Sequence, residues 1–191
     1  MPITTPITLT QALTLAADTL TGAYHLKLGD LLNGTFPDAE RAQHLAEFGG
    51  VTAAGSEIDA ITTALYELRR LCRNKPKAST CELVLDLLDT EASPLSAITD
   101  SIIAHLPYLA AVVAEDNASN QHKPDKAAPK KEGGFQYRRL TVAETNKVLA
   151  DARERATAAK TLLEGLPAIL TRVRELAEAG DDLTPAAAWL K

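Results

Sequence analysis

Residues 58–72 carry the clearest periodic pattern in the chain. Their apolar side chains recur at every third or fourth position, at Ile58, Ile61, Leu65, Leu68 and Cys72. This spacing puts all five on one side of an α-helix, whereas a half-buried strand would alternate apolar and polar residues. A chain that contains such a stripe must supply other apolar helix faces to cover it. The segment therefore predicts a helix packed among helices.

The rest of the sequence agrees with a helical fold. Apolar residues make up 46% of the 191 residues, but most of them are Ala and Leu, with only three Phe, four Tyr and one Trp. Ala and Leu are strong helix formers, whereas strands draw on aromatic and β-branched residues. We therefore predict an all-α protein, and no segment is expected to form a strand.

Capping and helix-breaking residues divide the chain. Thr8 with Gln11, and Thr141 with Glu144, have the spacing of capping boxes at helix starts. Pro107 is expected to kink or split one helix, and residues 165–167 (Gly-Leu-Pro) are expected to interrupt another. We predict an N-terminal helical bundle over residues 1–114, a basic flexible loop over 115–139 and a C-terminal helical hairpin over 140–191. The hairpin could pack on the bundle as one domain.

Charge is distributed unevenly. Residues 69–77, here called basic island 1, contain five cations and no acid, and residues 123–139, called basic island 2, contain six cations and two acids. The islands together carry +9 in a chain whose net charge is −5, so the remaining residues carry −14. Such a separation creates local positive potential in an acidic protein.

Each basic island has two interpretations. Cations at a helix C-terminus are favoured by the helix dipole, and lysines are common in solvated loops. Alternatively, arginines beside exposed aromatic residues supply phosphate-binding groups and base-stacking surfaces. Phe135 and Tyr137 could equally pack into the core ahead of the helix at Thr141. The candidate nucleic-acid-binding residues are Arg69, Arg70, Arg73, Lys75, Lys77, Lys130, Lys131, Phe135, Tyr137, Arg138 and Arg139.

The sequence gives little support for catalysis. Glu40, His44 and Glu47 could share one helix face, but no matching carboxylates accompany them, and a solvated face explains them as well. Phosphate-loop, dinucleotide and serine-hydrolase motifs are absent from the sequence. We expect no catalytic residue, no bound metal and no cofactor.

The compartment follows from simple features. Cys72 and Cys81 have no metal-ligand or redox spacing, which suits a reducing environment. The longest apolar stretch, residues 106–114, is too short to span a bilayer, and the first residues do not resemble a secretory signal. A cytoplasmic protein with no membrane partner is expected.

Two functional hypotheses remain. In the first, the chain is a non-catalytic helical subunit of a larger nucleoprotein assembly. The two basic islands then contact the backbone of single-stranded nucleic acid or RNA, and acidic and apolar faces contact other protein subunits. In the second, the chain is a protein-only adaptor or structural assembly factor of a phage or bacterium, and basic island 2 is a solubilising linker.

Overall fold

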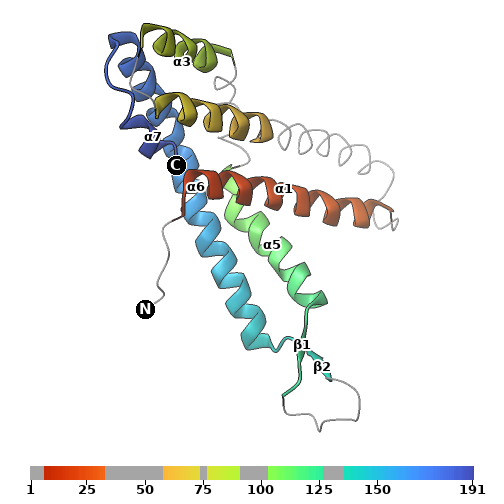
Figure 1. The fold of residues 1–191 in the computed structure, drawn as a ribbon. Helices are drawn as coiled ribbons and strands as arrows, with labels where there is room; N and C mark the ends of the chain where they lie inside the picture. Colours follow the sequence, from red (N-terminus) through yellow and green to blue (C-terminus); the bar gives the residue numbers. More distant parts are fainter. Residues whose placement is uncertain (1–6, 33–57, 74–76, 91–102, 127–135) are drawn as a thin grey trace.

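The computed structural model describes residues 7–32, 58–73, 77–90, 103–126 and 136–191. The prediction of an all-α protein is confirmed, with the addition of one small two-stranded sheet. In chain order the elements are α1 (Leu9–Leu32), a helix over residues 58–72 (helix 58–72), α3 (Ala78–Thr90), α5 (Ala104–Asn120), β1 (His122–Pro124), β2 (Tyr137–Arg139), α6 (Val142–Ala179) and α7 (Ala186–Trp189). Figure 1 shows α6 as the long axis against which the other helices pack.

Helix α6 is a single helix of 38 residues, about 57 Å long at 1.5 Å per residue. Its start at the Thr141–Glu144 capping box was predicted correctly, and it ends at Gly180, whose φ of 67° is left-handed. The predicted break at residues 165–167, and with it a hairpin of two helices, is absent. Pro167 lies on the exposed side of α6, and the buried stripe continues on both sides of it: Ala156, Ala159, Leu163, Leu166, Leu170, Val173 and Ala177. Core packing along this stripe outweighs the hydrogen bond that the proline removes.

Helix α5 runs antiparallel to α6, and α1 crosses both (Figure 1). At the crossing, Gly22 of α1 lies against Val113 of α5. Pro107 falls in the first turn of α5 and not in its middle, so it costs the helix little. The helix continues to Asn120, six residues beyond the end expected at residue 114.

The predicted stripe of helix 58–72 is confirmed, because all five of its apolar residues are buried. The following helix is buried on one face only. Leu83 is 54% exposed, and the buried residues are Cys81, Val84 and Leu88. Helix α3 therefore lies on the outside of the core, where it contacts α6.

The C-terminal residues close the fold. Leu183, Ala186 and Leu190 are buried, and the carbonyl of Lys191 accepts a hydrogen bond from the backbone N–H of Thr10. Trp189 is half-buried, and the guanidinium carbon of Arg172 lies 4.8 Å from the centre of its ring. Trp189 and Leu190 thus both pack against the core, with Leu190 as the fully buried member.

Candidate functional site

The two ends of the expected flexible loop pair with each other. Strands β1 and β2 form an antiparallel ribbon in which His122 lies opposite Arg139, Lys123 opposite Arg138, and Pro124 opposite Tyr137. The backbone N–H of Asp125 adds a hydrogen bond of 2.6 Å to the carbonyl of Gln136. The prediction that no segment forms a strand is therefore wrong. Helices α5 and α6 run side by side, so they bring the chain on either side of residues 127–135 close enough to pair (Figure 1).

One face of the ribbon is anchored to α6. Lys123 and Arg138 are directly opposed, and such a like-charged pair is unfavourable by itself. Glu144 relieves it: its carboxylate accepts hydrogen bonds of 2.7 and 3.0 Å from Arg138 and lies 3.7 Å from the ammonium of Lys123. These three residues lock the ribbon onto the first turn of α6.

Glu144 also caps α6. The backbone N–H of Thr141 donates a hydrogen bond of 2.9 Å to its carboxylate, and the hydroxyl of Thr141 accepts one from the backbone N–H of Glu144. The hydrogen bonds from Arg138, followed by the backbone bond from Thr141, hold the pKa of Glu144 well below its usual range. The carboxylate is therefore charged at all physiological pH values.

The opposite face of the ribbon is open to solvent. Because side chains alternate along a strand, His122, Pro124, Tyr137 and Arg139 share this face. Tyr137 is 63% exposed, so the alternative in which it packs into the core is wrong. Within the described residues, Arg139 forms no ion pair. An exposed aromatic ring thus stands on the same side as a guanidinium that no described acid neutralises.

Basic island 1 has a different character. Arg70 is bound to Glu67, with 2.9 Å between its Nε and the carboxylate, which raises the pKa of Arg70 and lowers that of Glu67. Arg69 is half-buried, and its Nε has no hydrogen-bond partner in the described part of the chain. Arg73 and Lys77 are exposed. Among the described residues of this island, Arg73 and Lys77 therefore remain free to bind a ligand.

The described residues of the two islands lie at opposite ends of α6. The ribbon extends from one end of the α5–α6 pair, whereas helix 58–72 ends near α3 and the C-terminal half of α6 (Figure 1). Within one copy of the chain, these described residues therefore do not line a single groove. Of the candidate residues, Lys75, Lys130, Lys131 and Phe135 lie outside the described residues.

Sequence reasoning missed two residues of the site, one in the ribbon and one in α6. His122 shares the open face with Tyr137 and Arg139, and Glu144 fixes the orientation of Arg138. The Thr141–Glu144 box was recognised as a cap, but its second function depends on the ribbon and leaves no local signal.

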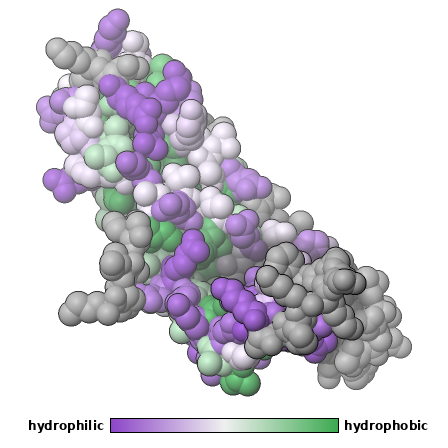
Figure 2. Space-filling view, turned by 60° about the horizontal axis from the view of Figure 1, so that its bottom comes forward, coloured by the Kyte–Doolittle hydropathy of each residue, from purple (hydrophilic) through white to green (hydrophobic). Residues whose placement is uncertain are grey.

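On the face shown in Figure 2, hydrophobic residues form patches separated by hydrophilic ones.

Other kinds of site find little support in the described segments. No group of three or more His, Cys, Asp or Glu side chains there is placed to hold a metal ion, and Glu40, His44 and Glu47 lie outside them. Cys72 and Cys81 are free and buried, and burial raises the pKa of the Cys72 thiol to about 11, so it stays protonated at neutral pH. Nor does any helix in these segments have the length and apolar character needed to cross a membrane.

Comparisons with protein-family models, with curated proteins and with solved structures gave no match for this chain. The function must therefore be argued from the ribbon and the surfaces around it.

Proposed function

We propose that the chain is a non-catalytic helical subunit of a nucleoprotein assembly and that the ribbon β1–β2 contacts single-stranded nucleic acid or RNA. The observation that carries the proposal is the open face of the ribbon, where exposed Tyr137 accompanies Arg139 and His122. An aromatic ring stacks on an unpaired base, and a guanidinium binds the neighbouring phosphate. Other protein subunits would contact the acidic and apolar faces.

The locked face of the ribbon supports this role. Lys123 and Arg138 are held in place by Glu144, so the ribbon does not have to be ordered when the ligand binds. Over residues 122–126 and 136–144, four cations against the two acids Asp125 and Glu144 leave this end positive, in a chain whose net charge is −5. A phosphate backbone is thus attracted to this end of the molecule in preference to its acidic remainder.

Basic island 1 takes a separate part in this proposal. Because it lies at the other end of α6, its exposed cations Arg73 and Lys77 would contact a second stretch of nucleic acid or none. Because the islands are separate, substitutions in one island serve as controls for substitutions in the other. The reduced state of Cys72 and Cys81 fits an assembly in the cytoplasm.

Fluorescence anisotropy with labelled single-stranded RNA and DNA of about 16 nucleotides tests the proposal, since this length covers one typical binding site. We expect Tyr137→Ala to weaken binding about 5- to 150-fold, because loss of one stacking aromatic costs about 1–3 kcal/mol. In a plot of log affinity against log salt concentration, Arg139→Gln should make the slope less steep by about 0.7. The control variant Arg73→Gln/Lys77→Gln should retain the affinity of the ribbon. Salt-independent binding, or equal binding by all variants, would contradict the proposal.

The protein-only adaptor is favoured by one observation. Arg70 and Arg138, one cation from each island, are already neutralised by Glu67 and Glu144 within the chain. In that function the ribbon orients the segment between its strands, and its cations serve solubility. The same titration decides between the two, because an adaptor binds neither RNA nor DNA at any salt concentration.

A further inference from the structure

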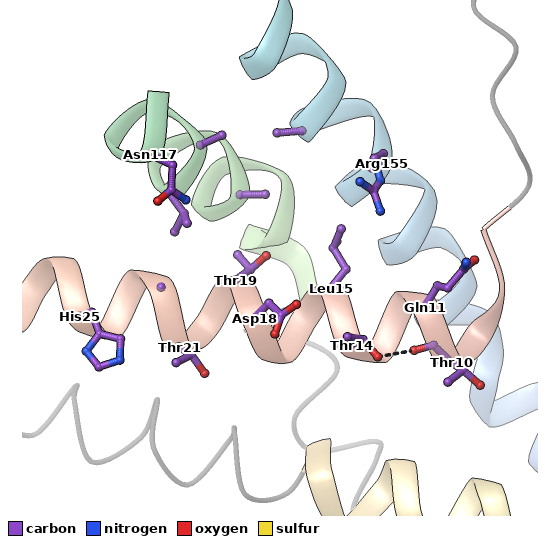
Figure 3. Close-up of a pocket in the computed structure, with 15 residues that line it drawn as sticks. Thr10, Gln11, Thr14, Leu15, Asp18, Thr19, Thr21, His25, Asn117 and Arg155 are labelled. Atoms are coloured by element: carbon purple, nitrogen blue, oxygen red, sulfur yellow. Dashed lines mark hydrogen bonds between the residues drawn. The ribbon is translucent and has the colours of Figure 1, made fainter. Parts of the chain in front are cut away.

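A concavity of about 660 Å³ lies where α1 crosses α5 and α6. Figure 3 shows the side chains of α1 beneath it, with α5 and α6 as its two other walls. Its deeper lining is small and apolar, including Ala110 and Val113 of α5 and Ala152 of α6. The polar residues around it are mostly exposed, so it is open to solvent and would cover a small molecule on one side only. The shape suits a segment of protein.

The part of α1 that borders the concavity carries almost no charge. Between Thr10 and His25, Asp18 is the only Asp, Glu, Lys or Arg, whereas 24% of the whole chain consists of these residues. The exposed positions are instead hydroxyl and amide side chains such as Gln11, Thr14 and Thr21. Depletion of charge is typical of the centre of a protein–protein interface and unusual for a helix face that stays in water. This stretch of α1 is about 22 Å long, which is enough to seat several turns of a partner helix.

Two unlike charges stand on opposite walls of the concavity. Asp18 of α1 and Arg155 of α6 are both exposed and both extend into the space between these helices (Figure 3). In the described part of the chain neither forms an ion pair, with each other or with a third residue. A surface with one unpaired acid and one unpaired base is complementary to itself. A two-fold axis would set Asp18 of each copy against Arg155 of the other.

We infer that this face is the contact between two copies of the chain. The weakly polar side of α1 from each copy lies in the concavity of the other. Two reciprocal Asp18–Arg155 pairs fix the relative orientation, and the Ala and Val side chains beneath them become buried. The ribbons stay outside this contact, so the inference is independent of what the ribbon binds.

Sedimentation equilibrium of the full chain tests the inference with charge reversal. The wild-type protein is expected to be a dimer. Asp18→Arg or Arg155→Asp alone should weaken the dimer more than about tenfold, because two like-charged contacts replace two favourable ones. An equimolar mixture of the two variants should restore a dimer, since each then supplies the charge that the other lacks, and the double variant should dimerise with itself.

The design includes its own controls. Arg153→Asp changes the charge of an exposed residue on another side of α6 and should leave the dimer unchanged. Circular dichroism of each variant monitors folding, and restoration in the mixture shows that both variants are folded. A monomeric wild-type protein at all accessible concentrations overturns the inference. So does a dimer that persists in both single variants, or a mixture that stays monomeric.

Discussion

Glu144 is the residue on which the candidate site depends most. Its carboxylate caps α6 through Thr141 and at the same time binds Arg138 and Lys123 across the ribbon. Arg138 therefore cannot leave for a phosphate without exposing an unsatisfied carboxylate. Within the ribbon, binding is left to the residues on the other face, and Arg138 acts as a structural residue that orients them.

Replacing Glu144 with Gln separates these two functions. A Gln side chain still accepts the capping hydrogen bond but loses the charge that holds the cations. We expect α6 to remain helical, while the ribbon amide of Asp125 exchanges its hydrogen faster with solvent. Hydrogen exchange followed by NMR measures this directly. The control Glu175→Gln, on an exposed position far along α6, should leave the exchange of Asp125 unchanged.

Glu144→Gln also tests how the contribution of Glu144 to stability depends on pH. The pKa of Glu144 is lowered in the folded protein, so its contribution to stability is present above the unfolded pKa of about 4.3 and is lost as the pH falls below it. Glu144→Gln imitates the protonated side chain at every pH. The difference in Tm between wild type and variant should therefore be largest near neutral pH and shrink below about pH 4. A difference that is independent of pH would contradict this account of the Arg138–Glu144 pair.

At the scale of elements, Pro167 tests whether α6 is one helix. Relative to Ala, a proline inside a helix lowers the free energy of unfolding by about 3 kcal/mol. Because proline also restricts the unfolded chain, about 0.4–1 kcal/mol of this loss is recovered. Pro167→Ala should therefore raise Tm by about 4–10 °C, at about 2–4 °C for each kcal/mol in a chain of this size. Pro185→Ala is the control, because Pro185 precedes the first turn of α7, where no hydrogen bond is lost, and should change Tm little. An unchanged or lower Tm for Pro167→Ala would indicate the two-helix hairpin that the sequence predicts.

The elements divide clearly into those that the sequence could predict and those that it could not. Caps at Thr8 and Thr141 and the stripe of helix 58–72 depend on neighbouring residues, and all were predicted. The uninterrupted α6 depends on packing along its whole buried face, which outweighs a local breaker. Strands of three residues are too short to show alternation, so the ribbon is visible only once α5 and α6 bring its ends together.

At the scale of the whole molecule, the candidate site shows the same limit. The residues of both basic islands were identifiable from charge alone, and Tyr137 from its place beside two arginines. The division of their described residues between opposite ends of α6 is a tertiary property, and so is the pairing of Arg138 with Glu144, whereas Arg70 pairs with Glu67 within one turn of the same helix. The number of cations in a stretch of sequence is therefore an upper limit on the positive charge that is available to bind a ligand.

The arrangement of α1 over α5 depends on one small residue, because a Cβ at Gly22 would lie 2.8 Å from Cγ1 of Val113. Gly22→Ala should lower Tm by up to about 8 °C, because overpacking costs about 1–3 kcal/mol, the helix propensity gained offsets about 1 kcal/mol of it, and the branched Val113 cannot rotate freely. Gly165→Ala is the matched control: no atom lies within 4 Å of its added Cβ, so Tm should rise. Val113→Ala should recover much of the loss when combined with Gly22→Ala. If Gly22→Ala instead stabilises the protein as Gly165→Ala does, α1 does not cross α5 at this distance.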